Sequence, residues 1–315
     1  MRKSKYLVLS SFYFNDDLTK IIKINELFKK QNILDLFRFD KIKIIIAEEF
    51  SKHENLNFIY LPVSIEKIDE YSFWNCKIQI LDLSNCINLK NIERSVFHKN
   101  QIKYLKLPQT IENINEYAFF NNQIKILDLS NCIKLKNIGG AVFRENQIKQ
   151  LKLPDNIEEI EQFAFFKNQI EILDLSNCIN LKNIERSVFY KNQIEILDLS
   201  NCINLNIINE WAFKSNQIKQ LKLPKNIEII EYSAFENNQI EILDLSNCIK
   251  LKHIVFDAFS SNPLNEIKIL DNIEIGYDKK NMDDLWNNFT KYYNDNNKKA
   301  GDYKLENNKW KWYPL

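Results

Sequence analysis

The sequence predicts an α/β repeat protein: a right-handed solenoid with a parallel β-sheet on its concave face and short helical or irregular turns on its convex face. Two recurring sequence motifs support this prediction. LDLSNC begins at residues 81, 127, 173, 197 and 243, and LKLP begins at residues 105, 151 and 221. Successive motifs are 24 or 22 residues apart, and a period of this size is typical of a solenoid, in which each coil stacks on the next.

Each coil reads as a short strand followed by an outer turn. In residues 148–168, Leu151 and Leu153 alternate with Lys152, which predicts a strand with its leucines inside and its lysine outside. Pro154 ends the strand because proline has no backbone N–H to donate. A phenylalanine and an asparagine recur three residues apart and are expected to form two buried ladders: Phe97, Phe119, Phe143, Phe165, Phe189, Phe213, Phe235 and Phe259, and Asn100, Asn122, Asn146, Asn168, Asn192, Asn216, Asn238 and Asn262.

The pattern places about twelve coils in a solenoid domain that spans residues 1–271. Their strands are predicted to start at Leu7, Leu34, Ile59, Leu81, Leu105, Leu127, Leu151, Leu173, Leu197, Leu221, Leu243 and Ile267. The first two coils are degenerate, with Leu34 and Leu36 lying 47 residues before Leu81 and Leu83. We expect these two coils to cap the stack, because terminal repeats of a solenoid are atypical.

A C-terminal cap is predicted over residues 272–315, where the repeat stops. Leu285, Phe289 and Tyr292 stand at helical spacing, and acidic residues precede them as at a helix start. The stretch from Tyr303 to Trp312 is rich in aromatic residues and is predicted to form a short hairpin. We interpret this segment as a lid over the end of the stack, with an aromatic binding patch as the alternative.

The composition argues against several classes of function. The 43 basic and 42 acidic residues leave a net charge of +1, which does not suit a nucleic-acid binder. No apolar run is long enough to insert into a membrane. With four glycines and no glycine-rich phosphate loop, the sequence predicts no cofactor. Three scattered histidines indicate neither a metal site nor a catalytic residue, so we expect no enzyme activity.

The six cysteines are predicted to be buried thiols. Five of them occupy one position of the repeat, and most are two coils apart, about 9.6 Å at the strand spacing and too far for a disulfide. Only Cys178 and Cys202 are in adjacent coils. Unpaired cysteines and the lack of a clear signal peptide favour a cytoplasmic location, with the cell surface or secretion as the alternative.

The repeat resembles a known family. Residues 148–168 carry the pattern I-x-x-L-x-L-P-x-x-I-x-x-I-x-x-x-A-F-x-x-N, which is similar to the BspA-type, or Treponema-type, leucine-rich repeat. The cysteine that usually follows Ala-Phe in this family survives as Cys76, and its frequent glycine before that turn is matched at Gly139 and Gly140. The resemblance implies a leucine-rich-repeat solenoid. It also implies a binding protein, since family members are often surface or secreted binding proteins.

The outward residues of the strands form ordered columns. From Asp82 onward, the residue between the two strand leucines alternates between acid and base. Beside it runs an apolar column: Ile80, Tyr104, Ile126, Ile172, Ile196 and Ile242. Charged columns alone could simply keep the sheet soluble, but isoleucines on an exposed sheet suggest contact with a partner.

The alternation breaks once, where two LDLSNC coils follow each other. Asp174 is then expected beside Asp198 and Glu171 beside Glu195, so like charges should repel. This predicts an acidic site suited to a basic peptide or a divalent cation, while unequal recombination of the repeats would leave the same fault without function. The predicted ligand-binding residues are Glu171, Ile172, Asp174, Glu195, Ile196 and Asp198, with Tyr104, Lys106 and Lys152.

The sequence therefore predicts a non-catalytic scaffold that binds a protein or peptide on its concave sheet. Isoleucines would supply affinity, and charges would orient the partner. The alternative is a surface or secreted adhesin that binds host or matrix components. A degradation adaptor is a weaker third interpretation, because residues 1–55 contain no clear adaptor helix pair.

Overall fold

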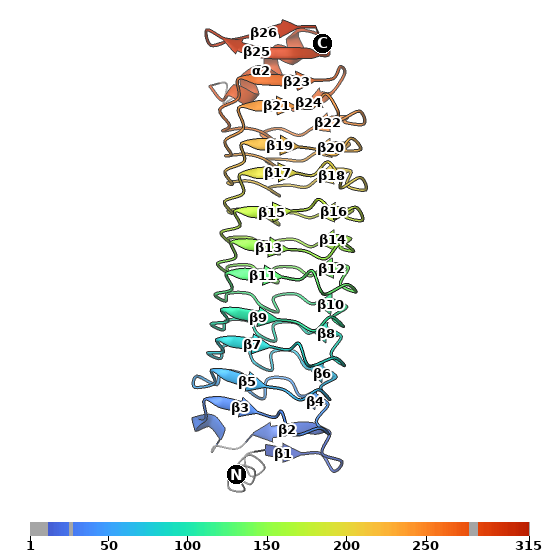
Figure 1. Ribbon diagram of the computed structural model, residues 1–315. Helices are drawn as coiled ribbons and strands as arrows, with labels where there is room; N and C mark the ends of the chain where they lie inside the picture. Colours follow the sequence, from blue (N-terminus) through green and yellow to red (C-terminus); the bar gives the residue numbers. More distant parts are fainter. Residues whose placement is uncertain (1–11, 25–27, 277–282, 315) are drawn as a thin grey trace. The chain divides into compact units, whose positions relative to one another are not determined.

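The computed structural model describes residues 12–24, 28–276 and 283–314. The chain divides into two compact units, residues 1–148 (unit 1) and residues 149–315 (unit 2). In each unit, short parallel strands recur once per coil and lie one above another (Figure 1). Every strand start predicted from Leu34 onward falls within such a strand, and the predicted start at Leu7 lies outside the described residues.

Unit 1 contains two sets of strands. The three-residue strands follow the leucine pattern: β3 (Ile33–Asp35), β5 (Phe58–Tyr60), β7 (Ile80–Asp82), β9 (Tyr104–Lys106) and β11 (Ile126–Asp128). A narrower set occupies the outer arc: β4 (Ile44–Ile45), β6 (Lys67–Ile68), β8 (Asn91–Ile92), β10 (Asn113–Ile114) and β12 (Asn137–Ile138). The outer turns are thus extended and irregular, and the coils between residues 31 and 276 contain no helix.

The N-terminal end of unit 1 is built differently from the other coils. β1 (Phe12–Phe14) and β2 (Lys20–Ile24) form an antiparallel hairpin, and β2 then pairs in parallel with β4 through Ile21 and Ile45. A 3-10 turn, η1 (Phe28–Lys30), follows. Phe12 therefore lies in a hairpin, and the described part of the first predicted coil departs from the repeat.

Unit 2 repeats the same plan. Its longer strands are β13 (Gln150–Lys152), β15 (Ile172–Asp174), β17 (Ile196–Asp198), β19 (Gln220–Lys222), β21 (Ile242–Asp244) and β23 (Glu266–Ile269). Its narrow strands are β14 (Glu159–Ile160), β16 (Asn183–Ile184), β18 (Ile207–Ile208), β20 (Ile229–Ile230), β22 (His253–Ile254) and β24 (Glu274–Ile275). β24 pairs with β22, so coil structure reaches Ile275.

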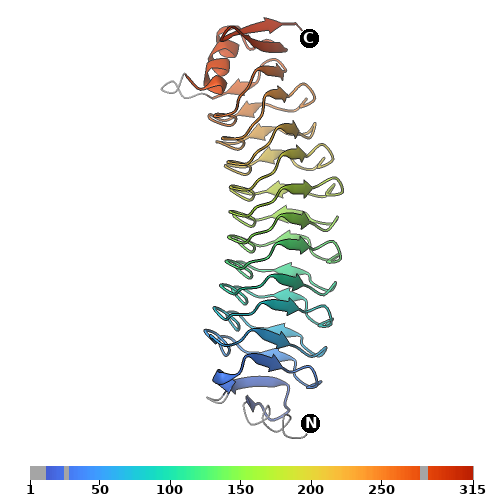
Figure 2. The same ribbon diagram turned by 60° about the vertical axis from the view of Figure 1, so that its left-hand side comes forward.

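The C-terminal segment of unit 2 contains a helix and a hairpin (Figure 2). Helix α2 (Leu285–Asp295) starts at Asp284, whose carboxylate accepts the backbone N–H groups of Trp286 and Asn287. β25 (Gly301–Glu306) pairs antiparallel with β23 and with β26 (Lys309–Tyr313). Because these strands cover the free edge of β23, they protect backbone groups that a bare sheet end would expose. The boundary of a separate cap domain at residue 272 stays a prediction.

Two side-chain ladders run through the core of each unit. In unit 2, the buried rings of Phe165, Phe189 and Phe213 stack at centroid distances of 5.5 and 5.4 Å. Asn216 accepts the backbone N–H of Ile194 and donates to the carbonyls of Phe189 and Phe213, so one amide joins two coils. These buried amides leave no hydrogen-bonding group of the side chain unused, as burial requires.

The outer turns store backbone strain. Two residues in most coils adopt positive φ without being glycine, including Trp211 at 57° and Ser215 at 55°. Gly139 serves another purpose, since a Cβ there would approach the carbonyl oxygen of Ile114 to 2.6 Å. The residues that take the left-handed conformation in this coil are Ala141 and Glu145, with φ of 53° and 56°.

Candidate functional site

The strand face of each unit exposes an apolar column. Several of the longer strands begin with an aliphatic or aromatic residue whose side chain is exposed to solvent. These residues are Ile80, Tyr104 and Ile126 in unit 1, and Ile172, Ile196 and Ile242 in unit 2. Ile172 and Ile196 are 64% and 58% exposed. Their exposure costs free energy that a partner could recover by covering them.

The backbone is interrupted at the doubled LDLSNC coils. β13 pairs in register with β15, and β17 pairs with β19, but β15 and β17 belong to separate sheets. The narrow strands β16 and β18 of the same two coils are also in separate sheets. Two further boundaries, β9 to β11 and β19 to β21, interrupt the longer strands alone. Among the described coil boundaries within either unit, this is the one where the ladder of longer strands and the ladder of narrow strands are both interrupted.

The joint interruption of both ladders coincides with a difference in loop length. Eleven residues separate Leu173 from Ile184 and Leu197 from Ile208, whereas nine separate Leu221 from Ile230. Elsewhere in unit 2 a long connection stacks on a short one, but here two long connections stack on each other. Side-chain amides bridge the coils instead: Asn201 and Asn204 donate to the carbonyls of Ser176 and Ile179, at 3.0 and 2.9 Å.

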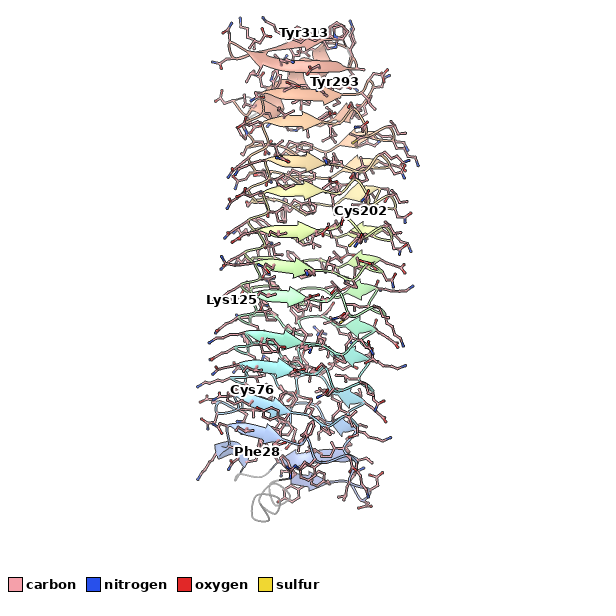
Figure 3. All side chains as sticks on the ribbon, viewed as in Figure 1. Phe28, Cys76, Lys125, Cys202, Tyr293 and Tyr313 are labelled. Atoms are coloured by element: carbon pink, nitrogen blue, oxygen red, sulfur yellow. The ribbon has the colours of Figure 1, made fainter. Side chains whose placement is uncertain are left out.

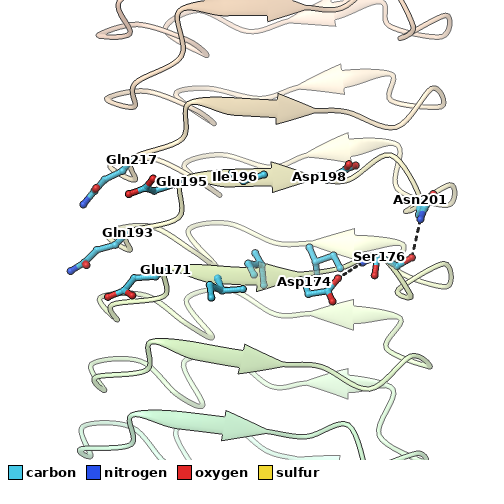
Figure 4. A pocket seen from close by; sticks show the side chains of 12 residues that line it. Glu171, Asp174, Ser176, Gln193, Glu195, Ile196, Asp198, Asn201 and Gln217 are labelled. Atoms are coloured by element: carbon cyan, nitrogen blue, oxygen red, sulfur yellow. Dashed lines mark hydrogen bonds between the residues drawn. The ribbon is translucent and has the colours of Figure 1, made fainter.

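A cavity of about 770 Å³ opens between β15 and β17 (Figure 4). We call it the β15/β17 groove. It is lined by residues of both coils: Glu171, Ile172, Leu173, Asp174, Leu175, Ser176, Gln193, Glu195, Ile196, Asp198, Asn201 and Gln217. Leu173 is 7% exposed whereas Leu197 is 1% exposed, so the gap gives limited access to the core leucine. The groove thus offers apolar surface at its centre and carboxylates at both ends of the strands.

The four carboxylates do not form an isolated acidic cluster. Lys149 Nζ lies 3.0 Å from the carboxylate of Glu171, on the side away from the groove. On the opposite side, Lys219 and Lys222 lie 3.2 and 3.0 Å from Glu195 and Asp198. Lys152 faces Asp174 in the β13–β15 register. Each carboxylate is therefore flanked by a lysine of the neighbouring coil.

The pKa directions of the two aspartates argue against the expected repulsion. Hydrogen bonds from the hydroxyl and the N–H of Ser176 lower the pKa of Asp174, with a further contribution from Lys152. Partial burial pushes the pKa of Asp198 upward, but hydrogen bonds from Ser200 and the charge of Lys222 outweigh it and leave the pKa lowered. Strong repulsion between these carboxylates would raise both pKa values. The serine hydrogen bonds, with a smaller contribution from the lysines, thus outweigh any rise in these two pKa values from the like-charge contact.

The predicted site residues are only partly brought together. The groove unites Glu171, Ile172, Asp174, Glu195, Ile196 and Asp198. Lys152 borders it on β13, whereas Tyr104 and Lys106 lie on β9 of unit 1, and their role in binding stays a prediction.

The sequence pattern did not lead us to predict a second row of exposed isoleucines. It comprises the residue after the repeated cysteine: Ile87 and Ile133 in unit 1, and Ile179, Ile203 and Ile249 in unit 2. The signal was the isoleucine that follows every LDLSNC. Gln193 and Gln217, which also line the groove, carry no such signal, because glutamine occurs at this place in most coils.

The cysteines are buried and unpaired (Cys76 and Cys202 are labelled in Figure 3). Burial raises the pKa of Cys202 to about 11 and that of Cys178 to about 12, so both are protonated at neutral pH. In the described residues, no group of three or more His, Cys, Asp or Glu side chains could hold a metal ion. The described part of the chain also contains no helix that is long and apolar enough to span a membrane.

Several solved structures are similar to this chain. A leucine-rich repeat protein from Bacteroides ovatus has a TM-score of 0.56 at 17% identity, covering 85% of this chain and 77% of the other. The leucine-rich effector YopM from Yersinia pestis has a TM-score of 0.48 at 20% identity, covering 84% and 70%. A leucine-rich cell-surface protein from Faecalibacterium prausnitzii has a TM-score of 0.45 at 14% identity, covering 88% and 94%.

No curated protein matches the sequence. The family comparison is decisive, because the model of the BspA-type leucine-rich repeat region matches residues 20–136, 132–240 and 182–280, in six copies. These matches cover most of the coils described above. The chain is a leucine-rich-repeat solenoid, a repeat scaffold, and it belongs to the BspA-type leucine-rich repeat family.

Proposed function

We propose that this scaffold is non-catalytic and binds a segment of another protein in the β15/β17 groove. The observation that carries the proposal is the pair Ile172 and Ile196, which are exposed at the centre of a cavity of about 770 Å³. Fully covering one such side chain contributes about 1.5–3 kcal/mol, so the pair could supply much of the affinity for a short segment. The adhesin alternative has no comparable observation in its favour.

The chemistry of the groove supports recognition rather than catalysis. The two aspartates have lowered pKa values and are poor proton donors at neutral pH. The buried thiols Cys178 and Cys202 have raised pKa values and are poor nucleophiles. What the groove presents to a partner is an apolar strip with hydrogen-bond acceptors at its ends.

A selection experiment tests this proposal. Random 15-residue peptides displayed on phage would be selected on the wild-type protein and then measured against two variants. Ile172→Ser combined with Ile196→Ser removes the apolar centre of the groove. Ile242→Ser is the matched control, because Ile242 is 54% exposed at the same strand position outside the groove.

We expect the selected peptides to bind wild type and Ile242→Ser equally, and the double variant at least about tenfold more weakly, since tenfold corresponds to about 1.4 kcal/mol and the two partly covered isoleucines together contribute at least that much. Equal binding to the double variant would show that the groove is not the binding site. A selection that yields no peptide above background would also count against the proposal.

A further inference from the structure

The charges around the β15/β17 groove repeat in reverse order on its two sides. Each of four consecutive strands of unit 2 presents a row of three residues: the one before the strand, the first of the strand and the last of the strand. These rows are Lys149, Gln150 and Lys152; Glu171, Ile172 and Asp174; Glu195, Ile196 and Asp198; Lys219, Gln220 and Lys222. All twelve side chains are exposed. The surface is therefore a palindrome with an apolar centre, acidic ends and basic outer rows.

The dimensions of this pattern limit what fits on it. Glu171 and Asp174 are three residues apart in an extended strand, which corresponds to about 10 Å. The two basic rows are three coils apart, roughly 15 Å at the spacing of neighbouring strands. A complementary partner must therefore place an apolar group between two cations about 10 Å apart along the strands, with acidic groups on either side.

An α-helix that lies along the strands meets these requirements. Residues i and i+7 of a helix are about 10.5 Å apart on one face, and residues i+3 and i+4 lie between them. The helix diameter of about 10–12 Å covers two coils and leaves its flanks against the outer lysines. An added strand between β15 and β17 is disfavoured, because the Phe189 and Phe213 rings of these two coils stay 5.4 Å apart and a strand between them would need about twice the usual strand spacing.

The same pattern disfavours a second copy of this face centred on the groove. A two-fold axis through the groove would place the carboxylates of one copy on those of the other. Glu171, Asp174, Glu195 and Asp198 already share the lysines of their own chain, and no cation of the second copy would reach them at the centre.

Resting on the function proposed above, we infer that the β15/β17 groove binds an amphipathic helix of a partner protein. The helix carries basic residues at i and i+7, apolar residues at i+3 and i+4, and acidic residues on its flanks. The basic residues reach the two ends of the strands, and the apolar pair covers Ile172 and Ile196. The flanking acids approach Lys149 and Lys152 on one side and Lys219 and Lys222 on the other.

Two synthetic helical peptides of identical composition test this inference. The matched peptide has lysine at i and i+7, leucine at i+3 and i+4, and glutamate at i+1 and i+6. The swapped peptide exchanges the lysines and glutamates and keeps the leucines. Binding of each labelled peptide is measured by fluorescence anisotropy at low and at high salt, with wild-type protein and with the Ile172→Ser, Ile196→Ser variant.

We expect the matched peptide to bind about tenfold more tightly than the swapped peptide at low salt, and the difference to shrink as salt screens the charges. Glu171→Gln combined with Glu195→Gln should reduce the difference by about half on a logarithmic scale, because it removes the carboxylates at one of the two ends of the strands. Glu241→Gln, which alters the same position on β21 outside the groove, should preserve it.

The outcomes separate this inference from the proposed function. Equal binding of the two peptides, lost in the isoleucine variant, would overturn the charge-patterned helix and leave the apolar groove in place. No binding of either peptide would also overturn the inference, while the phage-selected peptides would decide the proposed function by themselves. Selected peptides that bind without forming a helix, as seen by circular dichroism, would count against the inference alone.

Discussion

Two neighbouring coil boundaries in unit 2 share the strand β17 and differ in their backbone. Between β17 and β19, the strands pair over three residues and the N–H of Leu199 donates to the carbonyl of Lys222 at 2.9 Å. Between β15 and β17, the strands lie in separate sheets, and the N–H of Leu175 has no acceptor among the described residues. The first boundary stacks a long connection on a short one, and the second stacks two long connections.

The side-chain ladders do not change between these two boundaries. The rings of Phe189 and Phe213 are 5.4 Å apart across the groove boundary, and those of Phe213 and Phe235 are 5.5 Å apart across the regular one. The comparison teaches that the core side chains set the spacing of the coils at the outer turn. The strand ladders can be interrupted without a change in that spacing. A binding groove can therefore form without breaking the core.

Loss of the aromatic ladder at the groove boundary should have the largest effect. Phe189 is fully buried between Phe165 and Phe213, so Phe189→Ala leaves a cavity in the core. We expect a loss of about 3–5 kcal/mol in the free energy of unfolding, measured by urea denaturation. Ile172→Ala, at an exposed position, should change it by less than about 0.5 kcal/mol. A loss below 1 kcal/mol for Phe189→Ala would show that the aromatic ladder does not hold the coils together.

The asparagine ladder should come next. Asn216 joins the coils across the groove boundary, and Asn238 makes the same set of bonds across the regular boundary. Replacing either with alanine leaves buried backbone groups unpaired, at a cost of about 1–3 kcal/mol. We expect Asn216→Ala to cost more than Asn238→Ala in thermal or urea unfolding, since no strand ladder supports it. Equal costs would mean that the interrupted strands contribute nothing to the difference between the boundaries.

Hydrogen exchange should distinguish the boundaries in the unmodified protein. The amide of Leu199 is hydrogen-bonded to the next coil, as is that of Leu245. The amide of Leu175 should exchange roughly tenfold faster, because one backbone hydrogen bond contributes about 0.5–1.5 kcal/mol. Native-state exchange followed by NMR would measure all three residues. Equal protection of Leu175 and Leu199 would show that β15 and β17 pair in solution.

The smallest expected effect concerns the charge of Asp198. Its ion pair with Lys222 is surface-exposed, so Asp198→Asn should destabilise the protein by at most about 1 kcal/mol at pH 7. A pKa lowered by folding stabilises the protein above the unfolded pKa, and this contribution is lost as the pH falls through the folded pKa. The difference between Asp198→Asn and wild type should therefore shrink as the pH falls below the ordinary aspartate pKa of about 3.9, and vanish below the lowered pKa of the folded state.

Asp244→Asn is the matched control for this charge. Asp244 accepts the same serine hydrogen bonds, from Ser246, but the described residues show no lysine ion pair for it. Chemical unfolding of both variants between pH 3 and pH 8 would isolate the contribution of Lys222. Stabilisation by Asp198→Asn would mean instead that repulsion from Asp174 exceeds the lysine attraction.

The sequence by itself determined the coil period and the buried or exposed side of each repeated position. Leu173, Phe189 and Asn192 are inside, and Ile172 and Asp174 are outside, as their pattern predicted. Such features are readable because they depend on the local alternation of a strand and on a period that repeats many times. The doubled LDLSNC also marked where the groove would lie.

Only the tertiary structure decided how the doubled coils meet. The separation of β15 from β17 depends on two connections of equal length meeting in space, which no single coil reveals. The pairing of Glu195 with Lys219 and of Asp198 with Lys222 depends on which neighbour each long side chain can reach. The sequence indicated repulsion because it placed the like charges side by side. The structure shows attraction to the coils beyond, because electrostatic energy depends on distances to all neighbours rather than on order in the chain.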